Sequence, residues 1–298
     1  MKRLVKIIAP MVFCVGGTAN AAPIDLFSDW STSPTGTGLY SYDANPSTGG
    51  VQLTVDGSTH TSSALETGLG LSVTGGARSL WLTSADSANG LGKQAGFGVG
   101  YDTTFSTYAL AWSNGPGVHS TASVTWDGAN AGTAGTLCNT SASCSTLGTF
   151  GAFATSQDLK AGGKNGFELK SLISDQGFKF QIVAWTDATH WSMVTADADD
   201  IAGVKDYLFA NMTGGACGLV GPIGPGGLQT AIQCGTGGGA DFSNIWALQA
   251  NFTYLSGTSA VDLEIADVHT VPEPTSLALM GIGMLAAGGV ARRRLIKG

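Results

Sequence analysis

Glycine abundance is the feature that most limits how this chain can fold. The chain has 45 glycines among 298 residues, about 15%, which is roughly twice the usual share. Because each glycine inside a helix costs about 1 kcal/mol relative to alanine, an all-helical fold is excluded. Apolar residues make up 43% of the chain, so it can bury a core and is not disordered by charge.

Short strand patterns recur along the middle of the chain. The expected strands are rich in β-branched and aromatic residues and are bounded by residues that favour turns. They cover residues 51–55, 79–83, 97–101, 108–112, 122–126, 167–172, 178–185, 191–195, 246–254 and 261–265. This density of strands predicts an all-β fold, an antiparallel β-sandwich of jelly-roll type over residues 22–270.

Alternation of apolar and polar residues is clearest in the last two expected strands. Within residues 246–254 and again within residues 261–265, every second residue is apolar, as in strands with one buried face. Ser256, Gly257 and Thr258 lie between them and predict a hairpin turn that pairs the two strands.

An acidic run precedes the one helix that the sequence predicts. Apolar side chains recur at helical spacing at Ile201, Val204, Tyr207 and Leu208. Asp197, Asp199 and Asp200 come just before them, where carboxylates accept hydrogen bonds from the first N–H groups of a helix. The alternative is a calcium site, since carboxylates in a loop suit a hard cation. Beyond that alternative, we expect no metal or cofactor.

The first 21 residues have the three parts of a secretory signal peptide. Three cations precede an apolar run at residues 7–15, and Ala19 and Ala21 form a small-residue cleavage site. Cleavage after Ala21 would make Ala22 the first residue of the exported chain.

A second membrane-directed segment ends the sequence. Pro272, Glu273 and Pro274 precede sixteen uncharged residues, 276–291, and the cationic tail 292–297 follows. A helix of sixteen residues is about 24 Å long, just enough to span the ~30 Å hydrocarbon core when its ends snorkel. Lys and Arg stay on the cytoplasmic side, so the chain before Pro272 lies outside the inner membrane.

This end of the chain resembles the PEP-CTERM sorting signal, which an exosortase processes in Gram-negative bacteria. The resemblance covers residues 271–298. It implies that Pro272, Glu273 and Pro274 form the recognition motif, that residues 276–291 are a transient transmembrane helix, and that the cytoplasmic stop is Arg292, Arg293 and Arg294. A permanent C-terminal anchor is the alternative.

The part between the two ends is acidic. Residues 22–271 hold 7 Lys and Arg against 20 Asp and Glu, a net charge of −13, which disfavours nucleic acids and anionic membrane surfaces as partners. Arg78 is the only Lys or Arg between residues 22 and 92. A lone arginine between two strands indicates a structural ion pair.

Four cysteines remain after the signal peptide, at positions 138, 144, 217 and 234. An even number in an oxidising compartment predicts two disulfides. Pairing between neighbours in the sequence gives Cys138–Cys144 and Cys217–Cys234.

Catalytic motifs of hydrolases, zinc proteases and nucleotide-binding enzymes are missing from the sequence. We therefore expect no catalytic residues and no enzymatic activity. Trp81 and Trp185 lie on strand faces opposite the apolar ones, which makes them candidates for stacking on sugar rings.

These features together predict a non-enzymatic, exported protein of the cell surface or the biofilm matrix. Its expected partners are an exosortase-like processing enzyme, the inner membrane during sorting, and exopolysaccharide outside the cell. Two alternatives belong to other classes: a carbohydrate-binding module, and a secreted glycan-active hydrolase whose carboxylate pair meets only in the fold.

Overall fold

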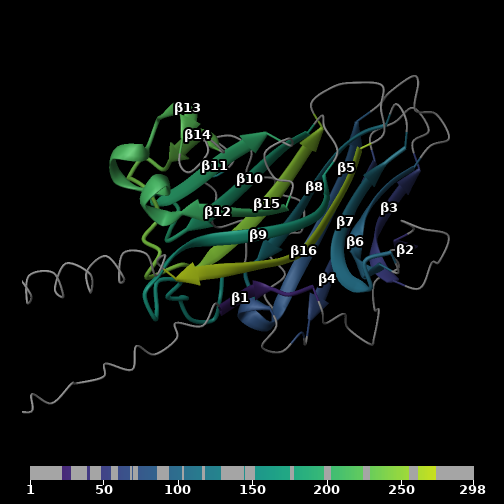
Figure 1. The fold of residues 1–298 in the computed structure, drawn as a ribbon, viewed down its shortest axis with the longest axis horizontal. Helices are drawn as coiled ribbons and strands as arrows, with labels where there is room; N and C mark the ends of the chain where they lie inside the picture. The colour runs from purple at the N-terminus through teal and green to yellow at the C-terminus, as the bar shows by residue number, and fades with distance from the viewer. Residues whose placement is uncertain are drawn as a thin grey trace, which may run out of the picture.

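The structure is a computed structural model, and it describes residues 22–27, 39–40, 48–54, 60–67, 69, 73–85, 94–102, 104–115, 118–128, 144, 152–174, 178–197, 203–223, 229–254 and 261–272. Its strands form two antiparallel sheets (Figure 1), so the predicted all-β class is confirmed. Within the described residues, 3₁₀ turns interrupt the strands at η2 (Thr74–Gly76), η5 (Phe209–Met212) and η6 (Gly214–Ala216).

The first sheet contains both the first and the last described strands. Its eight members are β1 (Ala22–Asp25), β2 (Leu39–Tyr40), β3 (Thr48–Thr54), β6 (Gln94–Asp102), β7 (Thr107–Asn114), β9 (Lys164–Ser174), β12 (Gly203–Leu208) and β16 (Val261–Pro272). Hydrogen-bonded neighbours follow the order β12-β9-β16-β7-β6-β3-β2, and β1 pairs with β16.

The second sheet also has eight strands. They are β4 (His60–Thr67), β5 (Ala77–Ala85), β8 (His119–Trp126), β10 (Phe178–Trp185), β11 (Trp191–Asp197), β13 (Val220–Ile223), β14 (Gln229–Cys234) and β15 (Ala247–Tyr254), in the order β13-β14-β11-β10-β15-β8-β5-β4. Each of the ten predicted strands overlaps an observed strand, because alternation reports which face of a strand is buried.

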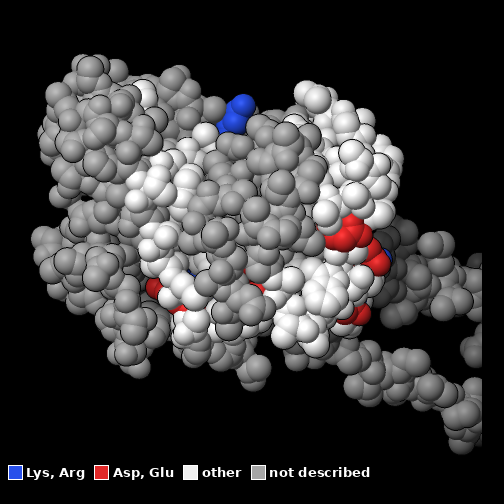
Figure 2. Space-filling model, turned by 180° about the vertical axis from the view of Figure 1, so that it is seen from behind, with Lys and Arg blue, Asp and Glu red and all other residues white. Residues whose placement is uncertain are grey.

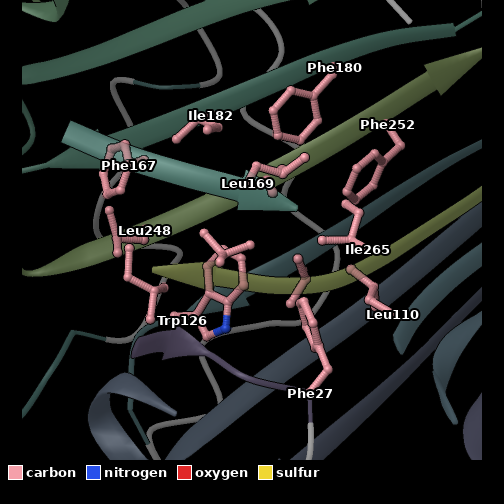
Figure 3. Close-up of a pocket in the computed structure, with 14 residues that line it drawn as sticks. Phe27, Leu110, Trp126, Phe167, Leu169, Phe180, Ile182, Leu248, Phe252 and Ile265 are labelled. Atoms are coloured by element: carbon pink, nitrogen blue, oxygen red, sulfur yellow. The ribbon is translucent and has the colours of Figure 1, made fainter. Parts of the chain in front are cut away.

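The core lies between the two sheets. Phe180 and Phe252 of the second sheet bring their ring centroids to 5.4 Å, and Trp112 of the first sheet meets Phe178 edge-on at 5.4 Å. Figure 3 shows such side chains converging from both sheets on one apolar cavity. That cavity measures about 10 Å³, room for at most one water molecule. The described side chains around this cavity therefore leave almost no empty space in that part of the core.

The hairpin predicted at Ser256, Gly257 and Thr258 is wrong. β15 pairs with β8 and β10 in the second sheet, whereas β16 pairs with β7, β9 and β1 in the first. A turn signal marks where a chain reverses but not which sheet the next strand joins. Both strands alternate because each has one face in the shared core.

The helix predicted after residue 200 is also wrong, because residues 203–208 form β12 and pair with β9. Tyr207 is buried against Phe180, whereas Val204 is 57% exposed. Apolar residues three positions apart share a face of a helix but fall on opposite faces of a strand. The backbone pairing of residues 203–208 with β9 makes this segment a strand and not a helix.

The sandwich extends past its predicted boundary at residue 270. β16 continues to pair with β9 at Val271 and Pro272. The predicted signal peptide and the predicted transmembrane helix, residues 276–291, lie outside the described residues. Within the part of the chain that is described, no helix combines the length and the apolar character needed to cross a membrane.

Candidate functional site

The two ends of the described chain lie side by side. In Figure 1 the purple β1 runs beside the yellow-green β16. The register partners are Ala22 with Thr270, Pro23 with His269 and Asp25 with Val268. We name this β1–β16 contact the terminal seam. It places the predicted first residue of the exported chain two residues away from Pro272, where the predicted recognition motif begins.

Apolar side chains anchor β1 in the core. Ile24 and Phe27 are 1% and 0% exposed, and both line the central cavity shown in Figure 3. The Thr74 hydroxyl donates a hydrogen bond of 3.0 Å to the Pro23 carbonyl. Burial of each large apolar side chain stabilises the fold by about 1.5–3 kcal/mol. The N-terminal segment is thus an integral part of the core.

A buried ion cluster links β1 to the second sheet. The Arg78 Nη1 atom lies 2.8 Å and 3.0 Å from the two carboxylate oxygens of Asp25, and Arg78 Nε donates to Glu66. The Trp126 indole donates a 2.8 Å hydrogen bond to Asp25. Arg78 and Asp25 are both 0% exposed. The structural ion pair predicted for Arg78 is therefore confirmed, and the structure identifies its partners as Asp25 and Glu66.

Burial sets the protonation behaviour of this cluster. Burial raises the pKa of the Asp25 carboxyl above its ordinary value, against the lowering effect of Arg78. Burial likewise raises the pKa of Glu66, which lies close to the same guanidinium. Although burial disfavours the Arg78 cation, the two carboxylates hold the Arg78 pKa above its ordinary value. The cluster has two carboxyl groups but only one guanidinium. As pH falls, one of the carboxyl groups is therefore the first group in the cluster to become protonated.

This arrangement predicts a pH dependence of stability. Because the pKa of Glu66 is raised above 4.5 in the folded state, the folded chain holds more protons than the unfolded chain above that pH. The contribution of Glu66 to the free energy of unfolding is therefore fully present at lower pH and is lost as pH rises through its folded pKa. Denaturant titrations at several pH values should show Glu66→Gln gaining stability relative to wild type as pH rises above 4.5. An unchanged difference between the two proteins would contradict the assignment.

His269 connects the seam to β9. Its Nδ1 atom lies 2.8 Å from Asp267, and its Nε2 atom lies 3.1 Å from Glu168 on β9. The end of β16 is thus held by side-chain contacts as well as by backbone pairing. Among the described residues, no group of three or more His, Cys, Asp or Glu could hold a metal ion.

The acidic run behind the calcium alternative lies mostly beyond what the structure describes. Asp197 is the last residue of β11, whereas Asp199 and Asp200 fall outside the described residues. The proposed role of this run in capping a helix is wrong, because β12 follows it.

Cys217 and Cys234 form a disulfide with a Cα–Cα distance of 5.5 Å, the pairing that local sequence spacing predicts. The bond closes a loop with a sequence separation of 17 residues, which stabilises the fold by about 3 kcal/mol in the chain-entropy model. Cys144 is also disulfide-bonded. Its predicted partner, Cys138, lies outside the described residues.

The expectation that Trp185 contacts a glycan is wrong. Trp185 is 0% exposed and packs with Trp191 and Met193 in a second apolar cluster. Its indole donates a 2.9 Å hydrogen bond to the Cys144 carbonyl, so a residue outside the strands covers this side of the sheet. Trp81 is only 9% exposed, which leaves no full ring face for a sugar. A residue that points away from the core can still be buried by chain that crosses the sheet.

An exposed groove surrounds the Cys217–Cys234 disulfide. It has a volume of about 550 Å³ and is lined by Gly214, Cys217, Gly218, Gln233, Cys234, Gly235, Thr236, Gly237, Gly238 and Gly239. None of these lining residues is charged. Gly235 has no room for a side chain, because a Cβ atom there would overlap the backbone carbonyl of Thr189. Backbone groups and the side chains of Gln233 and Thr236 could hydrogen-bond an uncharged polar ligand.

The fold and the seam define a β-sandwich whose last strand continues directly into a C-terminal processing segment. Comparison with known families identifies that segment: the PEP-CTERM protein-sorting motif matches residues 270–294. A comparison with curated proteins gives no match to the chain. The match begins at Thr270, the register partner of Ala22 in the terminal seam, and the predicted resemblance is confirmed. The chain is thus an exported protein that an exosortase-like system sorts during transient contact with the membrane.

Proposed function

We propose that this chain is a non-enzymatic protein of the cell surface or biofilm matrix of a Gram-negative bacterium, delivered there by exosortase-like sorting and associated with exopolysaccharide. The observation that carries the proposal is that a sorting motif continues the last strand of the sandwich. The core cavity of about 10 Å³ supports it, since that cavity has no space for a substrate.

Surface chemistry supports an uncharged glycan as the partner. The net charge of −13 over residues 22–271 opposes association with polyanions. Figure 2 shows that the described part of one face is largely uncharged, with a few Asp and Glu on both sides of it. A neutral polysaccharide meets no electrostatic penalty on such a surface and can hydrogen-bond to its polar groups.

A carbohydrate-binding module is the second candidate, and the groove around the Cys217–Cys234 disulfide favours it. Its 550 Å³ volume lies within the range of small-ligand sites. No carboxylate is among its lining residues, so the groove gives no support to glycoside hydrolysis, which requires a pair of carboxyl groups.

Cosedimentation with exopolysaccharide from the producing bacterium tests this proposal. We expect the wild-type chain to pellet with the polymer, and Gln233→Ala to weaken the association about 2- to 10-fold, as the loss of one hydrogen bond predicts. Gln157→Ala is the matched control, because Gln157 does not line the groove and its amide donates to the Thr155 carbonyl. A wild-type chain that stays in the supernatant would refute the glycan partner. Newly formed reducing ends in the polymer would show a hydrolase instead.

A further inference from the structure

We propose that Asp187 and His190 form the recognition element of the groove around the Cys217–Cys234 disulfide, and that His190 accepts a hydrogen bond there from a hydroxyl group of an uncharged sugar. This inference rests on the carbohydrate-binding function proposed above as the second candidate. It adds the residue that contacts the sugar, the residue that orients it, and the charge of the sugar that fits.

His190 lies at the glycine-rich rim of the groove, in the connection between β10 and β11. The Gly237 N–H donates a 2.9 Å hydrogen bond to the Thr189 carbonyl, and His190 forms a parallel bridge with Gly238. A Cβ atom at Gly237 would lie 2.7 Å from both Cε1 and Nε2 of the His190 ring. Because Gly237 and Gly238 line the groove, the outer edge of the imidazole is part of its rim.

The Asp187 carboxylate determines which ring nitrogen carries the proton. Its Oδ2 atom lies 2.9 Å from His190 Nδ1, and its Oδ1 atom accepts hydrogen bonds from the backbone N–H groups of Thr189 and His190. Partial burial would raise the pKa of Asp187, but the hydrogen bonds from Thr189 and His190 outweigh it and hold that pKa below its ordinary value. An ionised carboxylate can only accept, so Nδ1 of the neutral ring donates and Nε2 is left as an acceptor.

This acceptor is accessible and already oriented. The His190 side chain is 45% exposed, and the groove beside it has a volume of about 550 Å³. The contact with Asp187 restricts rotation of the ring before any ligand arrives, which lowers the entropy lost on binding. A sugar hydroxyl group supplies the donor that Nε2 needs.

The charges beside the groove select an uncharged sugar. The Asp187 side chain is 51% exposed. Asp241 is also exposed and lies next to the same connection, since its backbone N–H donates to the Thr186 hydroxyl. A sugar that carries a carboxylate or a sulfate would be repelled by both side chains, and the uncharged residues that line the groove offer it no cation. A neutral sugar meets no such repulsion.

Calorimetric titration tests the role of His190, with oligosaccharides prepared by partial hydrolysis of the exopolysaccharide of the producing bacterium as the probe. We expect His190→Ala to weaken binding about 3- to 10-fold, as the loss of one hydrogen bond predicts. Gly237→Ala should weaken it by a similar factor, because the added Cβ atom displaces the ring edge. His119→Ala on β8 is the matched control, since β11, β10 and β15 separate β8 from β14. Equal affinities of wild type and His190→Ala would overturn the proposal.

Asp187→Asn tests the orientation of the ring. Asparagine keeps an acceptor for the backbone N–H groups but presents an amide N–H to His190 Nδ1, which moves the ring proton to Nε2. The ¹⁵N chemical shifts of the His190 ring should report this change of tautomer, and the affinity should fall about 3- to 10-fold. Either an unchanged tautomer or an unchanged affinity would overturn the role of Asp187.

The charge of the ligand is tested with the same oligosaccharides after their primary hydroxyl groups have been oxidised to carboxylates. We expect the oxidised form to bind wild type at least about fivefold more weakly, because each carboxylate meets the charge of Asp187. Equal binding of the two forms would show that the groove does not select uncharged sugars. If Gln233→Ala weakens binding and His190→Ala does not, the groove binds glycans and this inference alone fails. If wild type binds no oligosaccharide, the proposed carbohydrate-binding function fails with it.

Discussion

Replacing Arg78 with methionine should lower the free energy of unfolding by about 3–5 kcal/mol, the usual cost of removing one partner from a buried ion pair. Methionine fills much of the same volume but leaves the carboxylates of Asp25 and Glu66 buried without their cation. Since total stabilities are about 5–15 kcal/mol, this loss is a large share of the whole. Urea or guanidinium titration, followed by tryptophan fluorescence, measures it.

Two further variants make this result specific to the cluster. Lys179→Met removes an exposed cation from β10 and should change stability by less than about 0.5 kcal/mol. Asp25→Asn leaves Arg78 and Glu66 as a neutral pair, so its effect should be smaller than that of Arg78→Met. If Arg78→Met and Lys179→Met lose the same amount of stability, the ion cluster does not hold the terminal seam.

The Arg78 cluster also shows what the sequence could and could not predict. A single cation in a long acidic stretch predicted an ion pair, and that was correct. Its partners could not be chosen, because Asp25 and Glu66 lie 53 and 12 residues away among many other carboxylates. Local patterns identify a residue that needs a partner, whereas the topology of the sheets decides which partner it meets.

Strand prediction succeeded where one face of a strand is apolar and failed where that pattern is missing. β4 carries four Ser or Thr residues and few apolar ones, and β1 is only four residues long and includes Pro23. Neither has the run of alternating residues that indicates a strand. Both were therefore missed, although β1 completes the core.

The sequence also could not predict that some residues facing away from the main core are buried. The sequence placed Trp185 correctly on the face away from the main core, but that face is covered by a second apolar cluster that includes Cys144. Alternation within one strand carries no information about chain that crosses the sheet. The terminal seam was unpredictable for a related reason, since it joins residues at opposite ends of the sequence.

The sorting signal could be predicted because its parts lie close together in the sequence and follow one another in a fixed order. Glu273→Ala should leave export intact but block maturation, so that most of the chain accumulates at full length in the inner membrane. The substitution alters the motif between its two prolines and leaves the strand up to Pro272 unchanged. Membrane fractionation with intact mass measurement, in a host that carries an exosortase, detects the unprocessed form. Asp206→Ala, at an exposed position on β12, is the matched control and should mature normally.

The predicted transmembrane segment gives a second prediction about sorting. Residues 276–291 are short for a span and contain four glycines, which lower both helix propensity and buried apolar area. A helix of this kind would be held only weakly in the bilayer. Its orientation would therefore depend on the cations at residues 292–294, which stay on the cytoplasmic side. Deleting them should let the tail pass through the membrane and escape processing. If the wild-type protein from such a host keeps its residues after Thr275, the segment is a permanent anchor and not a sorting signal.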